Sequence, residues 1–167
     1  MIVATMFLLT MMRSSPELGT HEGRCRPGEA GPAILVDVAG LRDRKGLLRL
    51  ELYPANDDDF LADDNVLLSA GKAFARVDAP VPETAAVRIC IKVPRPGSYA
   101  LSLLHDRNAN RRFDLAGDGI GFPGNPRLGW SRPSAQRAAV QAGSGVTHVG
   151  IRLNYRRGLS MRPLEAP

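Results

Sequence analysis

The chain has 167 residues, of which 44% are hydrophobic and 23% are charged, and its formal net charge is +5 at pH 7. This length suits one domain with a buried core, and the composition is that of a globular protein rather than a disordered or fibrous one. The 22 Lys and Arg residues are scattered singly and in pairs, without a basic run interleaved with aromatic residues. The sequence therefore argues against nucleic-acid binding.

The chain begins with an apolar run, from Ile2 to Met12, that has the length of a signal-peptide core and is too short to span a bilayer. No Lys or Arg precedes this run and no A-x-A cleavage pattern follows it, so an uncleaved or disordered leader is the alternative. We expect residues 1–28 to be a leader of the signal-peptide type with a linker. We therefore expect a periplasmic or secreted protein whose mature form has no transmembrane helix.

The two cysteines, Cys25 and Cys90, lie 65 residues apart, which is the spacing of neither a zinc site nor a redox C-x-x-C motif. In "AVRICIKVP", Cys90 alternates with branched apolar residues and shares its side of the strand with Arg88 and Lys92. Cys25 lies in a segment without a strand pattern, which is free to cover that side. We expect a Cys25–Cys90 disulfide, as oxidising compartments allow, with two unrelated thiols as the alternative.

Short strand patterns separated by polar turns follow along the chain. In order they are "AILVDVAG", "LLRLELY", a weaker "KAFARVDA", "AVRICIKV", "GSYALSLLH", "QRAAVQ" and "VTHVGIRLNY". About seven short strands without a segment of helical period predict an all-β protein, an antiparallel sandwich of the immunoglobulin-like or transthyretin-like kind. We expect this domain to cover residues 29–155, followed by an aperiodic tail over residues 156–167.

The period-two faces of these strands predict the core. The expected core residues are Leu48, Leu50, Leu52, Val87, Ile89, Ile91, Tyr99, Leu101, Leu103, Val149, Ile151 and Leu153. Arg49 and Glu51 alternate with the core leucines, so we expect them to face water. The five aspartates within residues 57–64 predict a solvated hairpin loop more readily than a cation site.

The stretch "HDRNANRRFDLAGDG" is the only part of the sequence that suggests metal chemistry. Its oxygen-bearing side chains fall at alternate positions, as in loops that bind Ca²⁺. The candidate ligands are Asp106, Asn108, Asn110, Asp114 and Asp118. Arg111 stands where such loops have glycine, and Gly117 stands where they have a bidentate acid. We expect a structural turn that takes up Ca²⁺ weakly, and a turn without metal is the alternative, because Asp and Asn form such turns alone.

The motif Y-x-L-x-x-x-H-D-x-N-x-N-x-x-x-D, with "GLRDRKG" before it and "GIGFPGNPRLGWS" and "IRLNY" after it, resembles a known family. Over residues 33–155 the chain is similar to the bacterial exported family catalogued as domain of unknown function 2141. The resemblance implies a secreted or periplasmic sandwich, transthyretin-like or carboxypeptidase-regulatory-like, without an established activity. Arg111 and Arg112 depart from the family, which usually has acidic residues or glycines there.

The long loop from Asp106 to about Pro133 is a candidate binding surface, because loops of this length in compact domains are usually functional or disordered. Residues suited to contact a sugar or peptide are Trp130, Phe122, Asn125 and Arg127. The alternative for Trp130 is a side chain that caps the core.

No nucleophile elbow, Gly-rich phosphate loop or H-E-x-x-H motif is present in the sequence, so we expect no enzyme activity. We expect a non-catalytic envelope module that binds an unknown ligand or protein partner through its end loops. The alternatives are a metal-dependent hydrolase that uses Asp106 and Asp114, and a structural spacer domain.

Overall fold

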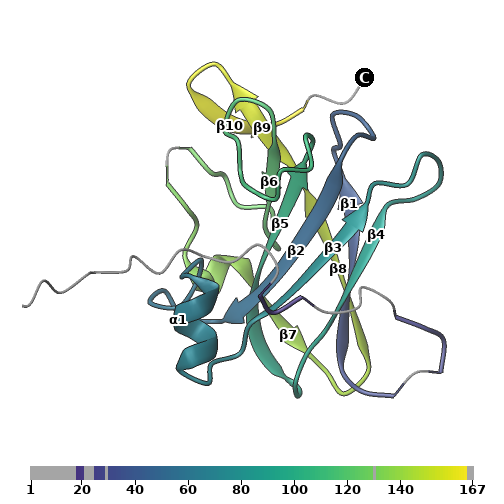
Figure 1. Cartoon of the computed structure of the whole chain (residues 1–167), viewed down its shortest axis with the longest axis vertical. Coiled ribbons are helices and arrows are strands. Elements are labelled where there is room, and N and C mark those ends of the chain that lie inside the picture. The colour runs from purple at the N-terminus through teal and green to yellow at the C-terminus, as the bar shows by residue number, and fades with distance from the viewer. Residues whose placement is uncertain (1–17, 21–24, 29, 130, 165–167) are drawn as a thin grey trace, which may run out of the picture.

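A computed structural model describes residues 18–20, 25–28, 30–129 and 131–164. Its elements are shown in Figure 1. The strands are β1 (Ala33–Ala39), β2 (Leu47–Pro54), β3 (Ala75–Pro80), β4 (Arg88–Lys92), β5 (Gly97–Asp106), β6 (Gly119–Gly121), β7 (Ala139–Ala142), β8 (Val146–Arg152), β9 (Asn154–Arg157) and β10 (Ser160–Pro163). The helices are α1 (Asp64–Ser69) and the 3-10 helix η1 (Ala135–Ala138). Neither helix in the described part of the chain is long and apolar enough to cross a membrane.

The strands form two sheets, so the predicted all-β sandwich is confirmed. The small sheet has the order β4-β1-β8, and the large sheet has the order β10-β9-β6-β5-β2-β3, with β7 also paired to β5. Two details differ from the prediction: the described residues form ten strands rather than about seven, and β1 and β8 pair in parallel. The single strand predicted over "VTHVGIRLNY" is interrupted at Leu153, so that β8 lies in the small sheet and β9 in the large one.

The structure also differs from the aperiodic tail that was expected after residue 155. Residues 154–163 instead form an antiparallel hairpin of β9 and β10, in which Arg156 is paired with Met161. Backbone pairing rather than an apolar period makes this hairpin, which is why the sequence pattern missed it. In Figure 1 the hairpin stands at the top of the molecule, at the end opposite β7.

The main core lies between the two sheets. Eleven of the twelve predicted core residues are buried in this one cluster, and Val149 packs against it partly buried. Period-two alternation therefore predicted the inward faces of β2, β4, β5 and β8 correctly. Ile34 and Val36 of β1 complete the core from the centre of the small sheet.

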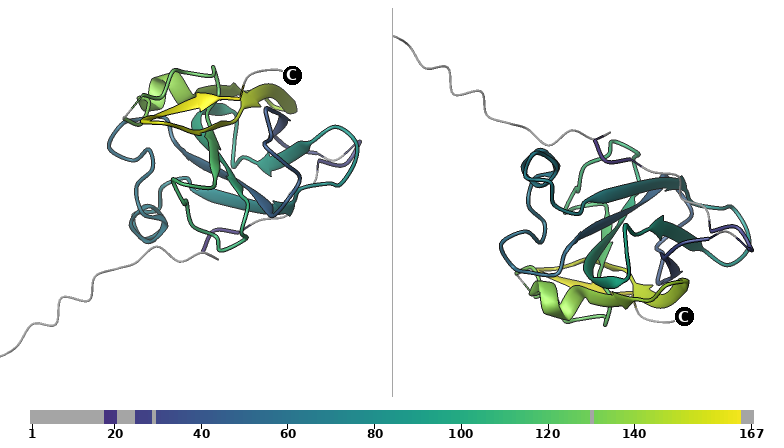
Figure 2. Two further views of the ribbon diagram at one scale, coloured as in Figure 1. Left: turned by 90° about the horizontal axis from the view of Figure 1, so that it is seen from above. Right: turned by 90° about the horizontal axis from the view of Figure 1, so that it is seen from below.

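A second apolar cluster covers the outer face of the large sheet. It includes Tyr53, Phe60, Leu67, Phe122 and Leu128. In the views from above and from below (Figure 2), α1 is seen end-on, to one side of the strands. Because α1, η1 and their loops pack there, this outer face is not the solvated surface that the alternating pattern predicted.

Some of the charged residues next to this cluster were therefore predicted wrongly, although Asp57, Asp58 and Asp63 are exposed as expected. Arg49, expected to face water, is only 5% exposed. Asp59 and Asp64 of the expected solvated loop are also buried, and each pairs with a cation, Asp59 with Lys72 and Asp64 with Arg76. Buried charges persist where such partners compensate for lost hydration.

The predicted disulfide is present between Cys25 and Cys90, with their Cα atoms 5.8 Å apart. Cys90 is 2% exposed although it lies on the polar side of β4, as expected for a thiol covered by the N-terminal segment. The same segment extends the large sheet, because the backbone nitrogen of Arg76 on β3 donates to the carbonyl of Gly19 over 2.8 Å. Residues 18–28, where described, are thus attached to both sheets.

Candidate functional site

The outer face of the large sheet carries rows of residues that the strand register places side by side. Glu51 on β2 lies opposite Arg76 on β3 and Ser102 on β5. In the next row on this face, Arg49 lies between Asp78 and Leu104. These rows form the floor of a cavity of about 520 Å³ between the α1 segment and the polar loop after β5.

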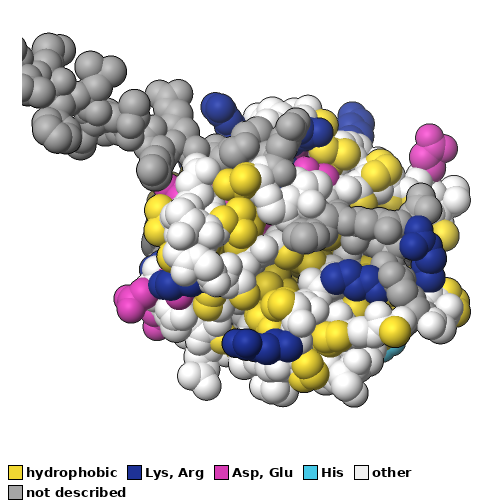
Figure 3. Space-filling model, turned by 60° about the horizontal axis from the view of Figure 1, so that its bottom comes forward, with side chains coloured by type: hydrophobic (Ala, Val, Ile, Leu, Met, Phe, Trp, Pro, Cys, Tyr) yellow, Lys and Arg dark blue, Asp and Glu magenta, His cyan; other side chains and the backbone are white. Residues whose placement is uncertain are grey.

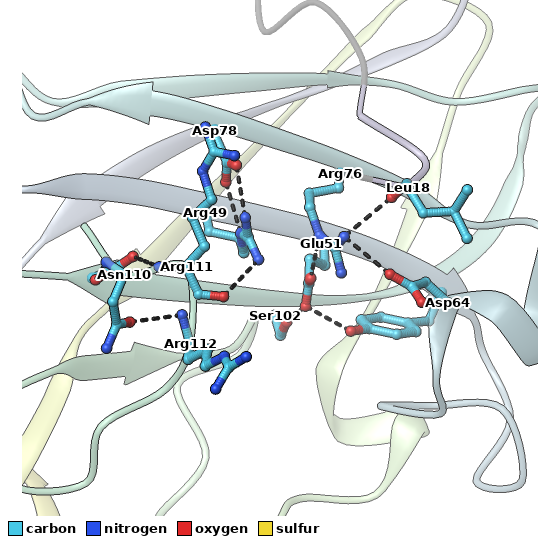
Figure 4. Close-up of polar contacts among 12 residues, drawn as sticks. Leu18, Arg49, Glu51, Asp64, Arg76, Asp78, Ser102, Asn110, Arg111 and Arg112 are labelled. Atoms are coloured by element: carbon cyan, nitrogen blue, oxygen red, sulfur yellow. Dashed lines mark hydrogen bonds and ion pairs between the residues drawn. The ribbon is translucent and has the colours of Figure 1, made fainter. Parts of the chain in front are cut away.

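The floor is a paired ion network (Figure 4). The guanidinium of Arg49 donates to both carboxylate oxygens of Asp78, each over 2.7 Å. Arg76 donates to Glu51 over 2.7 Å and to Asp64 over 3.1 Å. Both guanidinium groups are buried and poorly hydrated, and these charge-assisted hydrogen bonds give their donors acceptors in place of water.

Tyr53 and the backbone of the polar loop complete the network. The hydroxyl of Tyr53 donates to Glu51 over 2.6 Å, and Arg49 also donates to the carbonyl of Arg111 over 3.0 Å. Burial, together with the negative charge of Glu51, raises the pKa of Tyr53 well above its usual value, so the phenol keeps its proton. Among the described residues, no buried side-chain nitrogen or oxygen lacks a hydrogen-bond partner. The network therefore serves as a rigid floor and offers no unpaired acid or base.

An apolar pocket of about 290 Å³ adjoins this cavity, and we call it the loop–hairpin pocket. Residues of the loop after β5 line one side and residues of the β9–β10 hairpin line the other; the two cavities share Leu61, Phe113 and Ile120. Phe113, Leu115 and Leu159 are 44%, 47% and 73% exposed, although large apolar side chains usually avoid water. Three of the five large exposed hydrophobic residues in the described part of the chain thus gather in one pocket.

Arginine residues surround the hairpin. Arg132 and Arg156 line the loop–hairpin pocket. A neighbouring cavity of about 730 Å³, which shares Leu128 and Met161 with that pocket, holds four more: Arg127, Arg152, Arg157 and Arg162. No Asp or Glu is among the described residues that line either cavity. We call the side chains of these six arginines the arginine face.

The predicted calcium loop is a turn closed by its own hydrogen bonds. The carboxylate of Asp106 is 1% exposed and accepts the backbone N–H groups of Asn110 and Arg111. One oxygen of Asp114 accepts the amide groups of both Asn108 and Asn110, each over 2.7 Å.

The remaining candidate ligand, Asp118, closes the base of the same loop. Its two oxygens accept the backbone N–H groups of Arg107 and Asp114. Among the described residues, no three His, Cys, Asp or Glu side chains converge as a metal site requires. The five candidate ligands thus lie in one loop and are engaged in shaping it, and calcium binding stays a prediction.

The predicted ligand-binding residues do not share one surface. Phe122 is 1% exposed and belongs to the second apolar cluster, so it forms the inner wall of the loop–hairpin pocket rather than an exposed platform. Asn125 and Arg127 are exposed and line the neighbouring cavity, where the Asn125 side-chain oxygen accepts the backbone N–H of Arg152 over 2.7 Å. Trp130 lies outside the described residues.

Sequence reasoning missed the three exposed apolar residues of the pocket. Phe113 and Leu115 flank Asp114 inside a polar loop, and two large apolar residues at such positions were an available signal. The sequence held no comparable signal for Leu159, because this residue lies in the segment that was expected to be a tail. Its position follows from the β9–β10 turn and from the pairing of β9 with β6.

The opposite end of the sandwich has a larger hollow of about 760 Å³ (Figure 3). There hydrophobic side chains gather in the middle of the face, with Lys and Arg side chains around them. Its walls include Leu52, Val93 and Tyr99, which are buried ends of the main core, and none of the large exposed hydrophobic residues lines it. The loop–hairpin pocket is therefore the stronger candidate site.

Comparisons with known proteins identify a family and bring no activity. No curated protein and no solved structure matches the chain, so the transthyretin-like assignment stays a prediction. One family model, described as "Uncharacterized protein conserved in bacteria (DUF2141)", matches residues 36–150. This range contains strands β2 to β7, the polar loop and parts of β1 and β8. Since the match covers more than half of the chain, the protein belongs to the bacterial family DUF2141.

Proposed function

We propose that the protein is an exported, non-catalytic binding module that holds a small apolar ligand in the loop–hairpin pocket. The observation that carries the proposal is the gathering of Phe113, Leu115 and Leu159, all exposed, around one concave site. Ligand pockets are typically concave and mostly apolar, with a few polar groups at the edge. A volume of about 290 Å³ suits a short alkyl chain or a single ring system rather than a whole phospholipid.

The walls of the pocket are held in place before any ligand arrives. Phe122 packs edge-on against Phe60, with ring centroids 5.9 Å apart. The loop that carries Phe113 is closed by the hydrogen bonds of Asp114 with Asn108 and Asn110. A preformed site loses less conformational entropy on binding, so more of the apolar contact energy remains as affinity.

Two observations support the absence of catalysis. In the cavity next to the pocket, Glu51 and Asp64 pair with Arg76, and Asp78 pairs with Arg49. His105 is fully buried between the hydroxyl of Tyr155 and the carbonyl of Lys45, at 2.6 and 2.8 Å. These acids and this base are thus occupied with structural partners and do not face a substrate.

The disulfide supports export. A bond between Cys25 and Cys90 persists in an oxidising compartment such as the periplasm and is rare in the cytosol. The proposal therefore places the module in the cell envelope or outside the cell.

The test is a titration with N-phenyl-1-naphthylamine, an uncharged dye that becomes fluorescent in apolar surroundings. We expect saturable binding to the parent protein and at least tenfold weaker binding to Phe113→Ser and Leu159→Ser. The matched control is Val66→Ser, which removes an apolar side chain of similar exposure from α1, outside the pocket. Alkanols should displace the dye, each added methylene tightening binding roughly fourfold until the pocket is full, since a buried methylene contributes about 0.8 kcal/mol.

Two results would refute the proposal. One is a parent protein that does not raise the fluorescence of the dye. The other is equal binding by the parent, both pocket variants and the Val66→Ser control. Circular dichroism of each variant checks that the fold is retained, so that lost binding is assigned to the pocket.

A further inference from the structure

The arginine face has a composition that is uncommon on protein surfaces, which usually mix charges of both signs. Six arginines and no described acidic residue line the loop–hairpin pocket and its neighbouring cavity. Like charges gathered in this way repel one another and raise the local positive potential. An anion placed among them would relieve that repulsion.

Two of these arginines have guanidinium groups that contact no acceptor among the described residues. Arg127 and Arg152 are both exposed and line the same cavity, and only the backbone N–H of Arg152 is used, in its bond to Asn125. By contrast, Arg132 donates to the carbonyls of Phe60 and Asp57 and is held by the fold. Arg127 and Arg152 are thus the members of the arginine face whose guanidinium donors are all open to a ligand, whereas Arg156 and Arg162 each use one donor on a backbone carbonyl.

The charge lies next to the apolar site. The cavity of Arg127 and Arg152 shares Leu128, Ser160 and Met161 with the loop–hairpin pocket. A planar guanidinium recognises carboxylate and phosphate oxygens through paired hydrogen bonds. An apolar pocket beside such donors matches a molecule that has an apolar part and an anionic group.

We propose that the ligand is a small anionic amphiphile, whose alkyl part occupies the loop–hairpin pocket and whose acidic group lies at the arginine face near Arg127 and Arg152. This inference rests on the proposed function and adds the chemical class of the ligand. A free amphiphile fits better than a membrane surface, because Phe113, Leu115 and Leu159 line one concavity instead of projecting separately. Side chains that anchor a protein in a bilayer would have to point outward into it.

The experiment compares decanoate with decanol, which have the same chain length and differ in charge, as competitors of N-phenyl-1-naphthylamine at neutral pH. The test variant is Arg127→Gln/Arg152→Gln. The matched control is Lys45→Gln/Arg95→Gln, which removes two exposed positive charges that line neither cavity. Decanoate should bind the parent and the control at least tenfold more tightly than decanol does. The test variant should bind both equally, and the dye itself should bind all three proteins alike.

Salt adds a second readout, because the preference for decanoate should shrink as ionic strength rises while decanol binding does not. Equal competition by decanoate and decanol in the parent, with dye binding intact, overturns the inference and leaves the proposed function standing. A parent that does not bind the dye overturns both. Sedimentation of the protein with phosphatidylglycerol vesicles, without any preference for free decanoate, would assign the arginine face to membrane docking and also overturn the inference.

Discussion

Removing the disulfide between Cys25 and Cys90 should lower the stability of the domain substantially. The bond joins residues 65 positions apart, and the loop-closure relation gives about 4.3 kcal/mol at 25 °C for a loop of that length. Measured disulfides commonly contribute about 2–4 kcal/mol, because the unfolded chain keeps residual structure. We therefore expect Cys25→Ser/Cys90→Ser to lose about 2–4 kcal/mol of unfolding free energy.

Urea unfolding followed by far-ultraviolet circular dichroism measures this loss. With a dependence on urea of roughly 2 kcal/mol per M, the midpoint should fall by about 1–2 M. Dithiothreitol should shift the parent toward the variant and leave the variant itself unchanged, which controls for effects of the reductant. Equal midpoints for the oxidised parent and the double variant would refute the reasoning. So would two thiols that alkylate freely in protein purified without a reductant.

Four further changes test other parts of the structure. Leu101→Ala in the main core should cost about 2–5 kcal/mol in urea unfolding, and a parent-like melt would contradict the register of β5. Gly46→Ala should destabilise far more than Gly71→Ala in the same assay: both residues have positive φ, but a Cβ at Gly46 would lie 2.0 Å from a carbonyl oxygen, whereas none lies near Gly71. Burial lowers the pKa of His105, so the folded state resists its protonation; stability should be full above about pH 6.5 and fall below it by up to about 1.4 kcal/mol per pH unit, a dependence that His105→Gln should reduce. If the polar loop takes up Ca²⁺ weakly, as its alternating oxygens predict, the melting temperature should be a few degrees higher in 10 mM CaCl₂ than in EGTA, and Asp114→Asn should remove this rise; equal melting temperatures would show a turn without metal, with its oxygens used internally.

The inward faces of the sheets could be predicted from the sequence because one physical rule governs them. Residues two apart in a strand share a face, and a face that meets another sheet must be apolar. Leu48, Ile89 and Leu101 follow this rule, and all are buried in the main core. The disulfide followed from the same alternation, since it placed Cys90 on the side of β4 that only another segment could cover.

The outward faces could not be predicted in this way. Alternation assigned Arg49 and Glu51 to water, yet α1 and the polar loop cover them and their charges are paired with Asp78 and Arg76. A strand pattern indicates which residues share a face. It does not indicate whether a distant segment packs on that face.

The candidate site, too, could be predicted from the sequence only in part. Part of it is visible in the sequence, as the long loop from Asp106 to about Pro133. Its assembly is not, because Leu159 approaches Phe113 only once β9 has paired with β6 and the β9–β10 turn has closed. Local period and composition thus determined the two-sheet core, whereas long-range backbone pairing, which leaves no period in the sequence, decided where the pocket and its charges lie.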